Sequence, residues 1–274
     1  MLRAAFLIAL SIVPLFTQSS ELPLTVEDLL TANDRYRVDL DVNYFNDSTD
    51  EQLLAQKSNL DLVTVNMGLR YGLTLGTELS LQSSWQHMQA RYQQGTHLSQ
   101  MSDSHMSKWT LGATHRFAAD NGKHPALLAF ADAHYHQRED SGDNSWSWVY
   151  GITAYRSLDP ILLSASLSIG SHQPYRVANL RVTPGDSVTL VPTVSFAVNP
   201  WITLSGGLRW SWIEGHQLDG EEASINATKS ELILGLGYHW SQDLSIRVST
   251  DFALSEDSGS TLRLNLTYKF DESL

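Results

Sequence analysis

Cysteine is absent from the 274-residue sequence, which excludes a disulfide framework and any metal site built on thiolates. Basic residues are also scarce, because 18 Lys and Arg stand against 30 Asp and Glu and give a formal net charge of −12. A surface that binds nucleic acid needs a basic excess to neutralise phosphates. We therefore expect no nucleic-acid partner, and nothing in the composition calls for a cofactor.

Long apolar runs are confined to the N-terminus. Residues 4–16 are almost entirely apolar, Arg3 precedes them, and Thr17, Gln18 and Ser19 follow. This pattern predicts a signal peptide over 1–19, cleaved after Ser19, with a permanent anchor helix as the alternative. Further along the chain no run approaches the roughly 18 apolar residues that a membrane-spanning helix needs.

Apolar side chains recur instead at every second position. In 260–270 the apolar and polar positions alternate without a break: Leu262, Leu264, Leu266, Tyr268 and Phe270 against Arg263, Asn265, Thr267 and Lys269. Successive side chains of a strand point to opposite faces, so this run has one apolar and one polar face. Similar runs lie near 36–44, 63–71, 75–85, 106–117, 125–137, 145–156, 161–171, 187–198, 201–213, 229–240 and 244–252. They predict an all-β fold, a transmembrane antiparallel up-and-down β-barrel of about twelve strands over 35–270.

The polar face carries more charge than a packed core tolerates. A soluble β-sandwich also alternates, but burying so many ionised groups is costly unless they are paired or hydrated. We expect these charge rows to face a wet lumen: Arg37, Arg70, Arg116, Arg209, Arg247, Arg263, Asp39, Glu78, Asp132, Glu231 and Asp251. Adding Lys108, Lys269, Asp41 and Asp61 gives eight basic against seven acidic positions. A lumen so nearly balanced predicts weak ion selectivity or a cross-linked interior.

Aromatic residues gather toward the ends of the predicted strands. Trp and Tyr prefer the lipid–water interface, so two girdles are expected on the outer wall of a membrane barrel. The predicted girdle residues are Tyr71, Trp85, Trp148, Trp210, Trp212, Trp240, Tyr268 and Phe270.

The connections between the predicted strands alternate in length. Tight links lie at 72–74, 158–160, 199–200 and 241–243, and a somewhat longer one surrounds Asp120, Asn121 and Gly122. Long polar links lie at 46–59, 87–105, 172–185 and 214–227. Outer-membrane barrels have short periplasmic turns and long external loops, so both termini are expected in the periplasm.

Residues 20–34 form the predicted periplasmic leader. Thr25 is a plausible N-cap for a short helix over 25–30, because acidic residues occupy the first turn. The leader is interpreted as a linker, a lumen plug or a docking segment. Residues 271–274 are a C-terminal tail.

The hairpin from Gly68 to Leu81, with the sequence GLRYGLTLGTELSL, resembles a signature segment of the outer-membrane proteins grouped with the meta-pathway of phenol degradation. The strand opening at 34–37 is similar as well. This resemblance implies an outer-membrane barrel that passes small solutes, hydrophobic or aromatic compounds among them. The chain also resembles the pores that export functional-amyloid subunits, but it lacks the long helical extension expected of those proteins.

The predicted strands offer only weak candidates for metal-binding or catalytic residues. Asp132, His134 and His136 share one face and have ligand types that suit zinc, although ordinary lumen polarity is the simpler interpretation. His97 and Ser99 have the spacing of a barrel phospholipase motif, but Gln100 and Met101 depart from its continuation. A barrel protease would need acidic residues and a His at the external rim, where His136, Glu139 and Asp140 are expected. We predict no catalytic residue and no metal site.

The sequence therefore favours an outer-membrane channel or porter over an enzyme. The alternatives are a structural or secretion-associated barrel with a plugged lumen and, less favoured, a lipid hydrolase. The expected partners are outer-membrane lipid and lipopolysaccharide, a small-molecule solute, and the barrel-assembly machinery, which would recognise the C-terminal strand.

Overall fold

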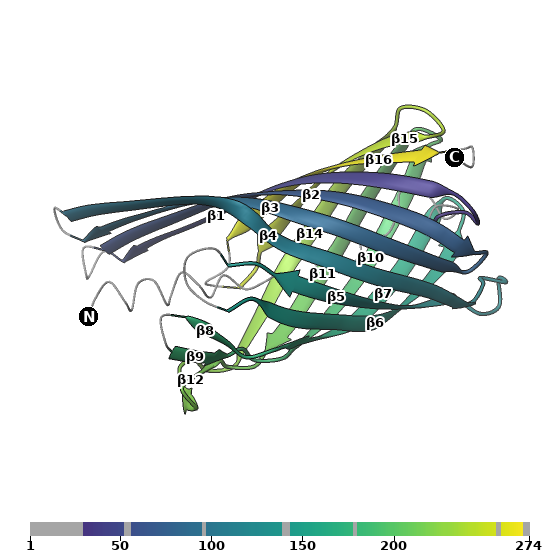
Figure 1. Ribbon diagram of the computed structural model, residues 1–274. Helices are drawn as coiled ribbons and strands as arrows, with labels where there is room; N and C mark the ends of the chain where they lie inside the picture. Colours follow the sequence, from purple (N-terminus) through teal and green to yellow (C-terminus); the bar gives the residue numbers. More distant parts are fainter. Residues whose placement is uncertain are drawn as a thin grey trace.

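The computed structural model describes residues 30–51, 56–94, 97–138, 143–177, 180–255 and 259–270. Twelve antiparallel strands close into a barrel in the order β1-β16-β15-β14-β11-β10-β7-β6-β5-β4-β3-β2 (Figure 1). The all-β class and the twelve-stranded barrel predicted from alternation are confirmed. Within the described ranges no helix is long and apolar enough to cross a membrane.

The barrel strands fall into a long group and a short group. The long strands are β1 (Tyr36–Glu51), β2 (Gln56–Thr74), β3 (Thr77–Gln94) and β4 (His97–Ala118). The shorter strands are β5 (Ala126–His136), β6 (Ser145–Leu158), β7 (Ile161–His172), β10 (Ser187–Asn199), β11 (Ile202–Ile213), β14 (Ala227–His239), β15 (Leu244–Ala253) and β16 (Ser260–Phe270).

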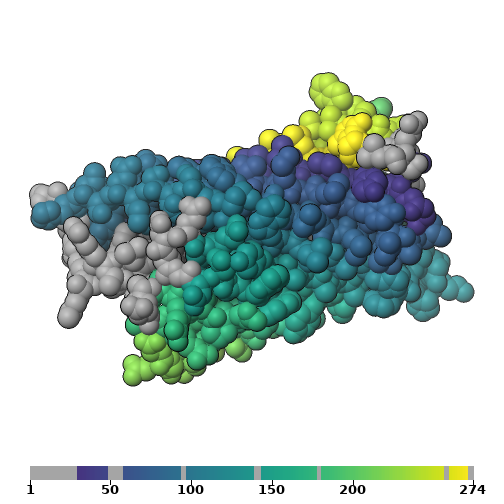
Figure 2. Space-filling model, in the orientation of Figure 1, coloured from purple at the N-terminus to yellow at the C-terminus, as the bar shows by residue number. Residues whose placement is uncertain are grey.

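The long strands overturn two loop predictions. The stretches 46–59 and 87–105, predicted to be polar loops, are mostly paired strand, with β1 paired to β2 as far as Glu51–Gln56 and β3 to β4 as far as Gln94–His97. These polar stretches belong to a sheet that rises beyond the rest of the wall, on which Leu62, Met88 and Ala90 are nonetheless buried. Figures 1 and 2 show this projection in the blue part of the chain.

A second, four-stranded sheet occupies parts of the other two predicted loops. It consists of β8 (Tyr175–Val177), β9 (Leu180–Thr183), β12 (Gln217–Leu218) and β13 (Glu221–Glu222), in the order β13-β12-β9-β8. Tyr175, Val177 and Val182 form a small buried cluster against Leu218, which gives this sheet a core of its own. The predicted loops 172–185 and 214–227 are therefore partly structured.

We call the end of the barrel that carries the tight turns the turn rim, and the opposite end the extended rim. Tight turns join β6 to β7, β10 to β11 and β14 to β15 where the sequence predicted them. The β2–β3 turn lies at Leu75 and Gly76 rather than at 72–74, because the strand pairing continues to Thr74–Thr77. The first residue of β1, Tyr36, pairs with the last of β16, Phe270, so the barrel begins and ends at the turn rim.

The outer wall is apolar. Its exposed large side chains include Leu79, Leu81, Leu111, Ile152 and Leu264. Of the predicted girdle residues, five are exposed, namely Trp85, Trp148, Trp212, Trp240 and Tyr268, and three are partly exposed, namely Tyr71, Trp210 and Phe270. A wall of this composition suits contact with hydrocarbon rather than water.

The predicted signal peptide 1–19, the helix expected over 25–30 (Leu30 excepted) and the tail 271–274 lie outside the described residues.

Candidate functional site

The barrel interior is the candidate functional site, because alternation along each strand directs the charged positions inward. Two ionic clusters lie there, each with two arginines and two carboxylates. The first cluster consists of Arg37, Asp39, Arg70 and Glu78, on β1, β2 and β3. The second consists of Arg209, Glu231, Asp251 and Arg263, on β11, β14, β15 and β16.

Arg70 is the centre of the first cluster. Its Nε lies 2.8 Å from Asp39 Oδ2 and its Nη1 lies 2.9 Å from Glu78 Oε1. Arg37 Nε lies 3.4 Å from the same Asp39 oxygen, and Thr267 Oγ1 donates to the other oxygen at 2.7 Å. Arg37 and Arg70 face each other directly in the β1–β2 register. Like charges so placed repel each other, and the shared Asp39 offsets that repulsion.

Glu78 also anchors residues 30–35, which we call the leader segment. The Thr31 amide and hydroxyl both donate to Glu78 Oε2, at 2.7 and 2.5 Å. Glu78 is 2 % exposed, so these bonds form away from bulk water. Hydrogen bonds to a buried carboxylate are stronger than bonds between neutral groups, and the leader is therefore firmly held to the inside of β3.

Backbone contacts and packing extend this anchor. The Asp34 amide donates to the Gly72 carbonyl at 2.8 Å, and the Gly72 amide donates to the Arg35 carbonyl at 3.0 Å. A Cβ at Gly72 would overlap the Ala32 carbonyl, so the close approach requires glycine. Leu30 packs against a buried apolar cluster formed by Ala126, Leu128, Tyr155 and Leu162 on β5, β6 and β7. The leader segment thus contacts both β2–β3 and β5–β7 near the turn rim.

The second cluster is more enclosed. Arg209 Nη1 lies 2.7 Å from Glu231 Oε2 and 2.5 Å from Asp251 Oδ2, and Arg263 Nη2 reaches the same Asp251 oxygen at 2.5 Å. Asp251 is 2 % exposed and Arg209 is 6 % exposed. The cluster joins four consecutive strands of the wall.

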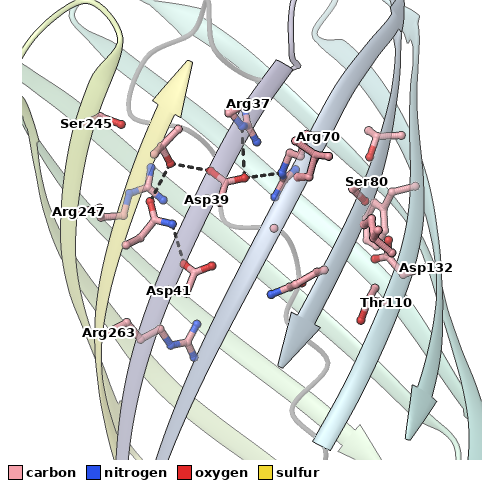
Figure 3. Close-up of a pocket in the computed structure, with 18 of the residues that line it drawn as sticks. Arg37, Asp39, Asp41, Arg70, Ser80, Thr110, Asp132, Ser245, Arg247 and Arg263 are labelled. Carbon is pink, nitrogen blue, oxygen red and sulfur yellow. Dashed lines mark hydrogen bonds and ion pairs between the residues drawn. The ribbon is translucent and has the colours of Figure 1, made fainter. Parts of the chain in front are cut away.

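A cavity of about 150 Å³ lies beside the first cluster. Figure 3 shows Arg37, Asp39, Arg70 and Asp132 around it, with Arg247 and Arg263 on the strands next to β1. Its ionisable lining residues are Arg37, Arg70, Lys108, Arg247, Arg263, Lys269, Asp39, Asp41 and Asp132, with His134 and His239. Phe130, Thr110 and Ser80 add an aromatic ring and two hydroxyl groups.

The structure places the predicted charge rows in three environments. Arg37, Arg70, Arg247, Arg263, Asp39 and Asp132 line the cavity, while Arg209, Glu78, Glu231 and Asp251 do not line it and form ion pairs within the clusters. Arg116 lies near the turn rim, where its guanidinium donates to the Leu75 carbonyl. Asp61, counted with the lumen, bonds instead to the hydroxyl of the exposed Tyr44 and lies on the outer face.

The histidines on β5 have neutral partners. His134 Nδ1 lies 2.8 Å from Thr110 Oγ1, and His136 Nε2 lies 2.8 Å from Ser147 Oγ. In the part of the chain that the structure describes, no three His, Cys, Asp or Glu residues are grouped so that they could hold a metal ion. His97 and Ser99 lie on β4 in the extended hairpin, not in a loop, and both are exposed. Glu139 and Asp140 fall outside the described residues.

Sequence reasoning missed the role of Leu30, Thr31 and Gly72. It left the leader open as a linker, a lumen plug or a docking segment, named no contact for it, and treated Glu78 as one more lumen charge. A glycine next to an aromatic strand end was the available signal, since an interior glycine in a strand often marks the close approach of another backbone.

No protein-family model matches this sequence, and no curated protein matches it. Among solved structures, the barrel is similar to the COG4313 outer membrane channel from Pseudomonas putida F1, with a TM-score of 0.69 and 14% identity over 88% of this chain and 97% of that one. It is also similar to the translocator domain of the autotransporter NalP from Neisseria meningitidis, with a TM-score of 0.56 and 10% identity over 86% and 88%. The transport unit of the autotransporter AIDA-I from Escherichia coli has a TM-score of 0.56 and 11% identity over 98% and 97%. This chain therefore shares its closed-barrel fold with outer-membrane channels and translocators.

Proposed function

We propose that this chain is an outer-membrane channel that lets small solutes cross by diffusion through the barrel. The observation that carries the proposal is the opposition of the two faces: an apolar outer wall and a charged interior that holds a cavity. A soluble barrel of this size would place its apolar face inward. The similarity in fold to an outer membrane channel supports the same conclusion.

The proposal includes an orientation. The turn rim would face the periplasm and the extended rim the exterior, because outer-membrane barrels have their short turns on the periplasmic side. Lipid and lipopolysaccharide would contact the outer wall, and the C-terminal strand β16 would be the part recognised by the assembly machinery.

The sequence resemblance adds hydrophobic or aromatic compounds to the solutes proposed. Phe130 supports this part of the proposal, because it places an aromatic ring on a cavity wall that is otherwise largely polar. Compounds that combine a ring with a polar group suit such a cavity better than pure hydrocarbons, which would leave the charged side chains without hydration or partners.

A barrel with a plugged lumen is the second candidate, and the docking of the leader segment favours it. Thr31 contacts β3 and Leu30 contacts β5, β6 and β7, so the segment spans several consecutive strands near the turn rim. In this alternative the leader closes the barrel permanently; in the first proposal it narrows the passage and leaves a route for solutes.

Reconstitution separates the two candidates. The purified chain in planar bilayers should give discrete conductance steps, and liposomes that contain it should swell in solutions of a small neutral sugar such as arabinose. Protein-free liposomes serve as the control. An electrically silent barrel that also excludes arabinose would reject the channel and favour the plug, whose release by the Leu30→Ala variant should then open it.

A further inference from the structure

The cavity has a charge of opposite sign to the rest of the molecule. Six cationic side chains line it (Arg37, Arg70, Lys108, Arg247, Arg263 and Lys269) against three carboxylates (Asp39, Asp41 and Asp132). With neutral histidines this is a formal excess of three positive charges, six minus three, inside a chain whose net charge is −12.

Two of these arginines also pair with carboxylates that do not line the cavity, Arg70 with Glu78 at 2.9 Å and Arg263 with Asp251 at 2.5 Å. Counting both carboxylates leaves an excess of one positive charge, and Glu231 is paired with Arg209 in the second cluster. Asp61 lies on the outer face with Tyr44. The lining of the cavity, taken alone, therefore differs from the near balance counted from the sequence for the lumen as a whole.

Three of the cations share one level of the barrel. In the strand register Lys269 on β16 faces Arg37 on β1, and Arg37 faces Arg70 on β2. Asp39 is the carboxylate beside them, and it already accepts bonds from Arg70 and Thr267 and is paired with Arg37. Its negative charge is thus shared between two arginines, and the local potential stays positive.

The strands next to β1 add two more cations, because β16 pairs with β1 and β15 pairs with β16. Arg247 on β15 and Arg263 on β16 project toward the same space (Figure 3). A concave site with an excess of charge of one sign and low-dielectric walls focuses the electric potential and raises the local concentration of counter-ions. Guanidinium groups are suited to carboxylates, because they match the two oxygens with two parallel donors.

We propose that this cavity is a binding site for small organic carboxylates, and that it makes the barrel prefer anions over cations. The transport half of this inference rests on the proposed channel function, whereas the binding half does not. Net charge alone would give the opposite expectation, since a chain at −12 favours cations.

Ion selectivity tests the transport half. With a tenfold KCl gradient across a bilayer, the sign of the reversal potential should report a chloride-to-potassium permeability ratio above one. The double variant Arg247→Gln, Lys269→Gln should lower that ratio severalfold. The matched control Arg176→Gln, Arg181→Gln removes the same charge from exposed positions in the small sheet of β8 and β9 and should leave the ratio unchanged. A cation-preferring wild type, or a control that shifts as much as the cavity variant, would overturn the proposal.

Folding of each variant is checked by circular dichroism and by heat-dependent gel mobility. Should the double variant fail to fold, Lys269→Gln alone and Asp132→Asn take its place. The first should lower the anion preference and the second should raise it, because each changes the charge of the cavity by one in opposite directions. Equal shifts in the same direction would contradict the proposal.

Ligand binding tests the other half without any conductance. Benzoate and benzylammonium have the same ring and opposite charge, and equilibrium dialysis against the detergent-solubilised chain at fixed ionic strength compares them directly. Benzoate should bind at least several-fold more tightly, and the Arg247, Lys269 double variant should lose that difference. Benzoate binding by an electrically silent barrel would leave the site standing and reject the channel, whereas equal binding of both probes would reject the site.

Discussion

The two ionic clusters have the same composition and different surroundings. Each has two arginines and two carboxylates, and in each one Asp oxygen is shared by both arginines. The first cluster faces the cavity and binds the leader through Glu78. In the second cluster only Arg263 lines the cavity, and Asp251 is almost fully enclosed by the wall.

This difference shows that the composition of an ionic cluster does not determine the role of each charged residue in the barrel. A carboxylate such as Asp251, which pairs with two arginines of the strands, stabilises the wall. A carboxylate such as Glu78, which also accepts bonds from a segment outside the strands, connects wall stability to the state of the lumen. We therefore expect substitutions in the two clusters to lower stability alike and to affect permeation differently.

The largest effect is expected at Asp251. Asp251→Asn removes the charge that Arg209 and Arg263 share and leaves two enclosed guanidinium groups without their common partner. Breaking a buried ion pair in this way costs about 3–5 kcal/mol of unfolding free energy. Urea unfolding of the chain in lipid vesicles, followed by tryptophan fluorescence, measures the loss.

Asp61→Asn is the matched control for this substitution. It removes one carboxylate whose partners, Tyr44 and Asn46, are neutral and which lies on the outer face. Its effect should stay below about 1 kcal/mol, since surface substitutions seldom exceed that. Equal losses for the two variants would mean that the second cluster contributes no more than a surface carboxylate.

The matched pair Glu78→Gln and Glu231→Gln separates the two clusters most directly. Each variant loses a charge-assisted bond to an arginine, so each should lower the unfolding free energy by about 2 kcal/mol. Glu78→Gln also weakens both bonds from Thr31 and should release the leader, which raises conductance severalfold. Bilayer recordings of the two variants at the same protein density provide the test. If Glu231→Gln raised conductance as much, the leader would not be the element that narrows the passage.

The sequence was sufficient to predict the strands of the barrel wall, but it was not sufficient to predict the contacts inside the lumen. Alternation such as that from Leu262 to Phe270 predicted strands, faces and the closed barrel, because the side-chain period of a strand is a local property. It could not predict that 46–59 and 87–105 continue as strand, since their polar residues suit either a loop or a sheet that rises beyond the rest of the wall. It also could not place Thr31 against Glu78, a contact between residues 47 positions apart. Such contacts depend on how twelve strands close, which no local pattern contains.

The smallest effect is expected at a turn carboxylate outside both clusters, Asp120, which serves as a reference for the size of the other effects. In the β4–β5 turn, Asp120 accepts the Gly122 amide at 2.9 Å and the Ser157 amide at 2.8 Å. These backbone hydrogen bonds, led by that from Gly122, lower the pKa of the Asp120 carboxyl below its ordinary value. A lowered pKa means that the contribution to stability is present above the ordinary pKa and disappears as the pH falls through the lowered one.

Replacing this carboxylate should therefore matter at neutral pH and not in acid. The Asp120→Asn side chain keeps an oxygen acceptor but has no charge to strengthen the two bonds. Its unfolding midpoint should lie slightly below that of the wild type at neutral pH and should approach it as the pH falls through the lowered pKa, where the wild-type carboxyl becomes protonated as well. Urea titrations at a series of pH values would show the two curves converging. A constant gap between the two unfolding midpoints across the series would mean that the charge of Asp120 contributes nothing to stability. Any other turn carboxylate would then serve equally well as the reference for the two clusters.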